Sequence, residues 1–335
     1  MKLSERIDLL EKLTALNGTS GYEDEVIDFI TSTLVSNDIP YHQDRLGNII
    51  VQTGKNPNRI ALFAHMDEVG FGVRGIREDG MIKFAAIGGV TDGILFSTPV
   101  VIGKNRIPGV IGNIPKHLQE KSTDKETKIP DMMIDIGATS KKDAENSVKI
   151  GDPIYWQSEF VRFGDGLIKA KALDDRVGVA VILALLLTKK YSFTAVFTTR
   201  EEIGIMGAKM VMPMISPQKA VVLEVTTCAD MPGATEPTTK MGEGVALSVL
   251  DGASVSHREW NEKIIMLATE KNIPYQKKLT TKGGNDAGAV TYVSGGVPTA
   301  TLSLPGRYIH SPSSVVCESD FDSMYRLAEH LIKKG

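Results

Sequence analysis

Histidine and carboxylate side chains follow two apolar segments of the chain that are typical of buried strands. His65 comes directly after the apolar run at residues 60–64, and Asp67 lies two positions further on. Glu201 and Glu202 follow a second apolar run in the same way. The carboxyl ends of strands in an α/β fold meet at the sheet edge where such folds build their sites. Because imidazole and carboxylate groups together suit zinc, cobalt or manganese, this edge is a candidate metal site.

Three further segments add ligands of the same kind. Asp174 and Asp175 precede the most apolar helical segment, where one aspartate would suffice as an N-cap. Glu224 interrupts the apolar run at residues 220–225, and a buried charge is costly unless it is paired or ligated. His310 follows another apolar run. One aspartate shared between two ions, with a histidine and a carboxylate for each, would form the two-metal site that aminopeptidases and phosphatases use.

Simple geometry predicts how two of these motifs are arranged. Residues two apart in an extended segment face the same way, so Asp67 is expected to hydrogen-bond the second ring nitrogen of His65. Glu201 and Glu202 are neighbours and are expected to point to opposite sides, one toward a metal and the other toward a proton. Taken singly, the motifs are also explained by a solvated strand end, a helix N-cap or a charged helix start.

Strands and helices alternate on both sides of a central segment. Helices are predicted from the apolar spacing at residues 7–13, 26–34, 176–190, 258–271 and 320–333, the second with a capping box formed by Ser20 and Glu23. Strands are predicted at residues 49–51, 60–64, 194–199, 220–225 and 299–304. This alternation indicates an α/β fold with a largely parallel or mixed sheet.

The central segment has a different pattern. Short pieces rich in Gly, Pro, Val and Ile succeed one another without a helical period, which indicates a small all-β domain inserted into the α/β one. We therefore expect a catalytic α/β domain from residues 1–69 and 164–335 and a β-rich insert from residues 70–163. The polar stretch at residues 115–130 is expected to be a loop within the insert.

Composition excludes several function classes. The 335 residues are 42% hydrophobic, which is enough for a folded core. A net charge of -3 and the lack of a Lys/Arg run give no support to a nucleic-acid partner. The longest apolar run has 11 residues, the amino terminus lacks a signal-peptide pattern, and only two cysteines occur. We therefore expect no membrane association and a cytoplasmic location.

Five motifs in order resemble the M42 family of dinuclear metallo-aminopeptidases. They are AHMDEVGF, KALDDRVG, TTREEIG, the strand around Glu224 and RYIHSP, and the similarity covers essentially the whole chain. The resemblance implies a three-layer α/β/α sandwich with an inserted barrel-like domain. It also implies small peptide substrates, two divalent ions (Zn²⁺ or Co²⁺, with Mn²⁺ as an option), and a homo-oligomer. In the family the insert mediates dimer contacts, and dimers assemble into dodecameric tetrahedral particles.

The resemblance also implies a role for each residue. His65 and Glu202 would hold one metal, whereas Glu224 and His310 would hold the other. Asp174 would bridge the metals, Glu201 would be the general base, and Asp67 would support His65. Position 224 is commonly Asp in the family, and the loop at residues 282–288 departs from the family in the residue before Asp286. We include Asp286 and Arg307 as candidate substrate-side residues.

Alternatives remain at this stage. A deacylase that removes N-acyl groups, or a carboxypeptidase, would use the same scaffold and metals. A metal-independent endoglucanase with Glu201 and Glu224 as its acid and nucleophile would leave both histidines unused. A non-catalytic assembly protein would leave the whole ligand set unused. The aminopeptidase is therefore the favoured hypothesis, with the preferred N-terminal residue left open.

Overall fold

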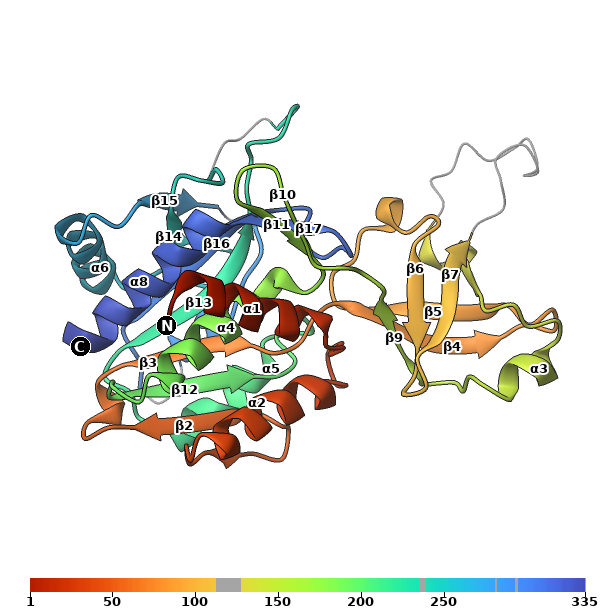
Figure 1. Cartoon of the computed structure of the whole chain (residues 1–335), viewed down its shortest axis with the longest axis horizontal. Helices are drawn as coiled ribbons and strands as arrows, with labels where there is room; N and C mark the ends of the chain where they lie inside the picture. Colours follow the sequence, from red (N-terminus) through yellow and green to blue (C-terminus); the bar gives the residue numbers. More distant parts are fainter. Residues whose placement is uncertain (113–127, 235–238, 281, 293–294, 335) are drawn as a thin grey trace.

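The chain forms a helix-covered mixed sheet and a separate β-barrel (Figure 1). The computed structural model describes residues 1–112, 128–234, 239–280, 282–292 and 295–334. Most of the polar stretch predicted as a loop at residues 115–130 lies outside these ranges. In the part described, no helix combines the length and apolar character needed to cross a bilayer.

The large sheet has eleven strands among the described residues, and its centre is parallel. β3 (Ala61–His65) pairs in parallel with β12 (Phe193–Thr198) and β13 (Ala220–Thr227), and β13 pairs in parallel with β16 (Thr299–Arg307). The outer strands run antiparallel: β1 (His42–Gln43) and β2 (Ile49–Thr53) at one edge, and β17 (Ser314–Cys317), β11 (Leu167–Ala170) and β10 (Val161–Phe163) at the other. β14 (Val245–Leu250) pairs with β16 and with β15 (Tyr275–Leu279).

Helices cover both faces of this sheet, as expected for a three-layer sandwich. One face packs against α1 (Leu3–Ala15), α2 (Asp24–Ser36), α4 (Leu173–Leu187), α6 (Arg258–Glu270) and α8 (Glu318–Lys334). The other packs against the shorter α5 (Met206–Val211) and α7 (Ala287–Val290). The core strands are buried on both faces, which explains their continuous apolar sequences.

The inserted barrel is closed. Its strands follow the order β4 (Gly70–Ile76), β5 (Ile82–Ile87), β8 (Met133–Asp135), β7 (Ile107–Gly112), β6 (Pro99–Ile102) and β9 (Pro153–Trp156), with the short α3 (Lys141–Glu145) alongside. Phe71 packs edge-on against Phe84 and Trp156 in the barrel core, with ring centroids 5.2 and 4.8 Å apart. The barrel strands end at Trp156, and β10 already belongs to the large sheet.

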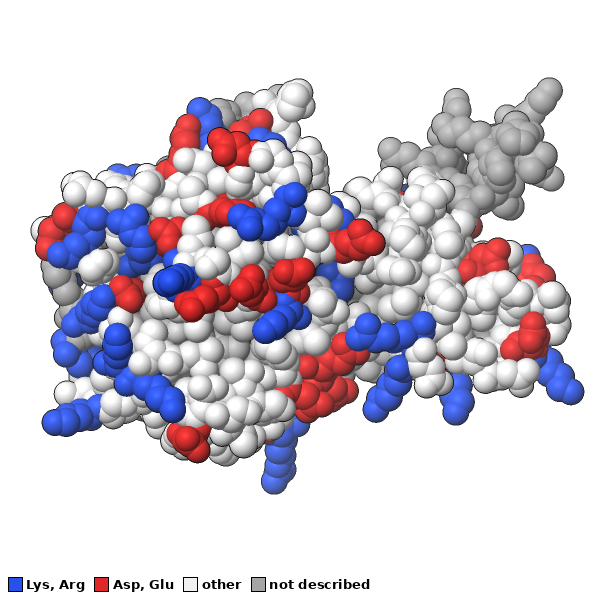
Figure 2. Space-filling view, in the orientation of Figure 1, with Lys and Arg blue, Asp and Glu red and all other residues white. Residues whose placement is uncertain are grey.

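Polar contacts join the barrel to the α/β part. The Trp156 indole donates a hydrogen bond to the Val69 carbonyl at 3.1 Å, just before β4. Arg106, in the turn between β6 and β7, pairs with Glu25 of α2 at 2.8 Å. Figure 2 shows acidic and basic side chains meeting at this junction of the two bodies. These contacts connect the barrel to the α/β part at Val69 and at α2.

The predicted capping box at the start of α2 is wrong. Glu23 is itself the N-cap residue, and its carboxylate accepts hydrogen bonds from the backbone N–H groups of Gly21 and Arg200. The Ser20 hydroxyl instead donates to Asp67 at 2.6 Å. A long-range partner beside the candidate site thus replaces the local capping contact.

Candidate metal centre

The parallel strands bring the predicted ligands together at one edge of the sheet. His65 ends β3, and Glu224 lies at the equivalent level of the neighbouring strand β13, because Phe63 pairs with Val222. Asp174 has non-helical backbone angles at the start of α4, and His310 follows β16. Glu202 lies in the turn after β12. The five side chains come from five separate stretches of chain, which the parallel register aligns.

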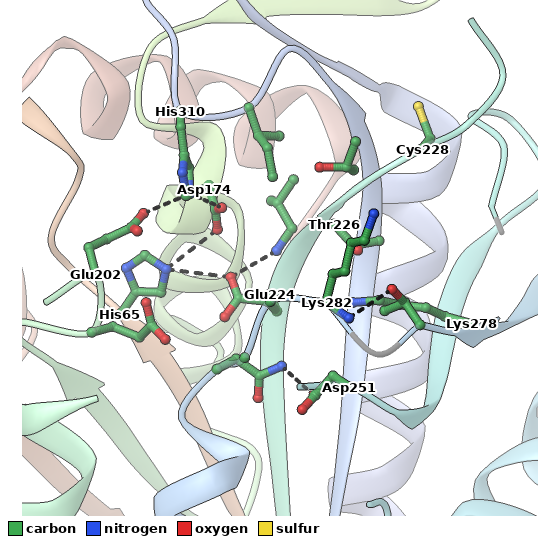
Figure 3. A pocket seen from close by; sticks show the side chains of 18 of the residues that line it. His65, Asp174, Glu202, Glu224, Thr226, Cys228, Asp251, Lys278, Lys282 and His310 are labelled. Carbon is green, nitrogen blue, oxygen red and sulfur yellow. Dashed lines mark hydrogen bonds and ion pairs between the residues drawn. The ribbon is translucent and has the colours of Figure 1, made fainter. Parts of the chain in front are cut away.

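The imidazoles and carboxylates form two clusters that share Asp174 (Figure 3). Nε2 of His65 lies 3.4 Å from Oδ1 of Asp174 and 3.4 Å from Oε1 of Glu224. Nε2 of His310 lies 3.4 Å from Oδ2 of Asp174 and 3.2 Å from Oε1 of Glu202. The family resemblance implied that Glu202 pairs with His65 and Glu224 with His310. The structure has the opposite pairing, because Glu224 is the strand neighbour of His65. Asp174 occupies the shared position in both arrangements.

Each imidazole is oriented by a contact at its other nitrogen. Nδ1 of His65 lies 3.1 Å from the backbone oxygen of Asp67, and Nδ1 of His310 lies 2.8 Å from the carbonyl oxygen of Gly89. With a proton on Nδ1, the Nε2 lone pair faces the carboxylates, which is the arrangement of a metal-ligating histidine. Gly89 belongs to the inserted segment, so the barrel side of the molecule helps to orient His310.

The Asp67 carboxylate mainly supports the turn that carries the two glutamates. Its Oδ1 accepts a hydrogen bond from the Glu201 N–H at 3.0 Å, and its Oδ2 accepts from the Glu202 N–H at 3.1 Å and from Ser20. The distance from its Oδ1 to Nδ1 of His65 is longer, at 3.5 Å. The hydrogen-bond partner of Nδ1 is therefore the Asp67 backbone oxygen and not the expected carboxylate, which has a role in the turn that the spacing of the motif did not reveal.

Glu201 and Glu202 do not point to opposite sides. One carboxylate oxygen of Glu201, one of Glu202 and a ring nitrogen of His65 all lie within 4.8 Å of one another. The expectation assumed extended chain, whereas β12 ends at Thr198 and Arg200 has a φ of 56°. Both carboxylates consequently face the same pocket.

The site carries an excess of buried negative charge. Burial raises the pKa of Glu224 well above its usual range, and repulsion from Asp174 adds to the rise. Burial would lower the pKa of His310, but hydrogen bonds to Asp174 and Glu202 raise it to about 11. Burial also raises the pKa of Glu201 well above its usual range. Burial and carboxylate crowding therefore act together here, and both make a positive charge favourable within the site.

The residues present fit divalent cations. Oδ1 of Asp174 is buried and accepts no hydrogen bond, although a buried carboxylate oxygen is costly to leave without a partner. The described residues contain three overlapping groups whose ligand atoms lie within 4.8 Å of one another: His65, Asp174 and Glu224; His65, Glu201 and Glu202; Asp174, Glu202 and His310. Nitrogen and oxygen donors of this kind suit zinc, cobalt or manganese.

The clusters open into a cavity of about 440 Å³, a size typical of small-ligand sites. Its far side includes Thr226, Cys228, Asp251 and Lys278. The lysine and Asp251 were not predicted as site residues. The sequence YQKKL at residues 275–279 marks a strand, but nothing in it indicates which lysine faces inward.

The two candidate substrate-side residues lie behind or beside this cavity. Asp286 is fully buried and accepts a hydrogen bond from Thr198 at 2.6 Å, and its neighbour Asn285 lines the cavity. Arg307 forms a bidentate ion pair with Asp230, both contacts being 2.9 Å, and is not among the lining residues. Neither side chain directly faces the cavity, so their contact with substrate stays a prediction.

Comparisons with known proteins cover nearly the whole chain. The M42 glutamyl aminopeptidase family matches residues 47–327. A glutamyl aminopeptidase of Lactococcus lactis is 31% identical over 95% of this chain and 93% of its own. A lysyl aminopeptidase of Pyrococcus furiosus is 27% identical over 98% and 96%.

Solved structures of similar proteins also match nearly the whole chain. The aminopeptidase APDkam598 of Desulfurococcus kamchatkensis is 33% identical with a TM-score of 0.92, covering 99% of this chain and 96% of its own. The TET1 peptidase of Pyrococcus horikoshii, described as assembling into a tetrahedron or a large octahedral shell, is 30% identical with a TM-score of 0.88, covering 98% and 99%. A Thermotoga maritima structure labelled endoglucanase is 31% identical with a TM-score of 0.79, covering 96% of each chain.

The family match and the alignments extend across both the α/β part and the inserted barrel, and the family's activity is the removal of N-terminal residues from peptides. The chain therefore belongs to the M42 glutamyl aminopeptidase family and is an aminopeptidase.

Proposed function

We propose that the site holds two divalent metal ions, with Asp174 between them and Glu201 as the general base of peptide hydrolysis. The observation that carries this proposal is the pair of imidazole–carboxylate clusters that share Asp174, with Nε2 to carboxylate distances of 3.2–3.4 Å. By this proposal His65 and Glu224 hold one ion, and His310 and Glu202 hold the other. When bound, such ions lower the pKa of water and polarise the scissile carbonyl.

Glu201 is the carboxylate best suited to move protons. Unlike Glu202 and Glu224, it forms no ion pair with either imidazole, although all three lie in the same pocket. The Glu201 backbone N–H donates a hydrogen bond to the Asp67 carboxylate at 3.0 Å, which supports the position of Glu201. In this role Glu201 removes a proton from the attacking water and delivers one to the leaving amine.

The test of this assignment is Glu201→Gln. The amide preserves size but cannot accept the proton, so turnover should fall by about 10²–10⁴-fold while bound metal, measured by elemental analysis, remains at two ions per chain. Chelation should abolish activity of the unmodified protein, and zinc, cobalt or manganese should restore it. Full turnover in E201Q would remove Glu201 from this role, and activity that survives chelation would refute the metal proposal.

We also propose that the chain is a homo-oligomer, with the barrel forming dimer contacts and dimers forming a dodecamer. The support is that one related TET1 structure is described as a dodecamer and another as assembling into a tetrahedron or a large octahedral shell. Light scattering should then give a mass near twelve times the 36.3 kDa of the chain. A monomeric mass would contradict the proposal.

The N-terminal residue that is removed does not follow from the family. The relatives compared above are named for glutamyl and lysyl substrates, whose side chains carry opposite charges. Selectivity must therefore come from residues that differ within the cavity.

A further inference from the structure

A buried lysine faces the candidate site from the opposite wall of the cavity. Lys278 lies on β15, lines the cavity and is only 7% exposed. Its neighbour Leu279 is 56% exposed on the other face of the same strand. A strand that stabilised the fold alone would place the leucine inward and the lysine outward. The reversed arrangement indicates that a cation is needed inside the cavity.

The Lys278 ammonium has no direct anionic partner. No hydrogen bond or ion pair within 4.0 Å joins it to another described residue. Asp251 shares the cavity, but its Oδ1 accepts from the N–H groups of Ala253 and Ser254 at 2.8 and 2.7 Å, and its Oδ2 accepts from Asn285 at 3.2 Å. Because Asp251 is held by these local donors, the lysine is left buried and unpaired, which is costly without a ligand.

Charged groups around the cavity limit what this lysine would accept. Burial lowers the pKa of Lys278, while Glu224, Asp251 and Asp174 act in the opposite direction. A cationic substrate side chain would be repelled by the ammonium, whereas an anionic side chain would pair with it. Lys282 is exposed at the same wall and adds positive charge at the entrance.

The position of Lys278 matches that of a substrate side chain. Figure 3 shows Lys278, Lys282 and Asp251 across the pocket from His65 and Glu202, with Glu224 between the two sides. A peptide whose first carbonyl reaches the metal centre would extend its first side chain into the remaining part of the cavity. We infer that Lys278 selects substrates with an acidic N-terminal residue, glutamate or aspartate, by pairing with its side-chain carboxylate. This inference rests on the proposed function, since it assumes that hydrolysis occurs at the metal centre.

The test compares aminoacyl-4-nitroanilides of Glu, Asp, Gln, Leu and Lys on the metal-loaded protein. The Glu substrate should exceed its uncharged isostere Gln in kcat/KM by about 10–100-fold, as expected for a buried hydrogen bond between charged groups. Lys278→Met should remove that ratio while changing the Gln and Leu rates by less than about threefold. Lys278→Arg should retain part of the preference, because the charge remains.

Lys282→Met is the matched control, since it makes the same change at an exposed lysine of the same cavity and should keep most of the preference. Product inhibition of the unmodified protein, with free glutamate binding more tightly than free glutamine, tests the inference without any variant. Equal rates for Glu and Gln, or an equal loss on all substrates in K278M, would overturn it. If no substrate of the panel is cleaved, the proposed function fails instead; if Leu or Lys is released but Glu is not favoured, only the selectivity inference fails.

Discussion

Replacing Asp67 by Asn tests how the fold holds Glu201 and Glu202 at the candidate metal centre. Three donors converge on the Asp67 carboxylate: the N–H groups of Glu201 and Glu202 at 3.0 and 3.1 Å, and the Ser20 hydroxyl at 2.6 Å. An asparagine has a single acceptor oxygen and an NH₂ group. Whichever way the amide is turned, its NH₂ faces at least one of the backbone N–H groups.

The magnitude follows from burial. Asp67 is fully buried, so water cannot replace the lost acceptor. An unsatisfied buried donor costs about 1–3 kcal/mol. At about 1.4 kcal/mol for each factor of ten, displacement of the turn should lower kcat/KM or metal affinity by about 5–150-fold. Both quantities are affected because the turn carries Glu201 and Glu202 together.

The assay is steady-state hydrolysis of an aminoacyl substrate together with zinc titration monitored by calorimetry. Ser20→Ala is the graded control, because it removes one donor and leaves both backbone hydrogen bonds, so its effect should be smaller, about tenfold or less. Unchanged kcat/KM and unchanged zinc affinity in D67N would refute the positioning role. An effect of S20A as large as that of D67N would show that the hydroxyl, and not the backbone contacts, is what matters.

Three other perturbations examine separate parts of the site. His310→Ala should reduce bound metal from two ions per chain to one, measured by elemental analysis, because it leaves the His65 cluster intact; retention of two ions would contradict the grouping. Gly88→Ala should weaken metal binding at His310. Gly88 has a φ of +84°, and an added Cβ would lie 2.7 Å from Val69, so the substitution should displace the adjacent Gly89 carbonyl that contacts His310. Gly93→Ala is the control, because the space around Gly93 is open and the substitution should change nothing. Arg307 holds the pKa of Asp230 at about 2, below the 3.8 of the unfolded chain, so the pair stabilises the fold fully above pH 4 and less as the pH falls from 4 to 2. Arg307→Met should therefore lower Tm at pH 7 and flatten its decline between pH 4 and 2, and parallel Tm curves for the two proteins over that range would disprove the linkage.

The sequence predicted the elements that position the site because their patterns are local. The five strands and five helices expected from apolar spacing all occur, with ends that differ by a few residues. The inserted β-rich segment was recognisable because a helical period was missing from it. His65 and Glu224 were recognisable as charges at the end or in the middle of apolar strands.

The arrangement within the site was less predictable because it depends on contacts between distant segments. The pairing of Glu224 with His65 follows from the register of β13 against β3, which no local pattern encodes. The contact of Asp67 with the turn at Glu201 spans 134 positions of chain. The inward direction of Lys278 depends on how β15 is placed beside β14, so the sequence alone shows only two adjacent lysines.

Anomalous diffraction at the zinc edge, from crystals of the zinc-loaded protein, is the most direct examination of the central claim. The account predicts two peaks per chain, one beside Nε2 of His65 and the other beside Nε2 of His310, with an oxygen of Asp174 ligating each. A single peak, or peaks remote from these three side chains, would contradict it.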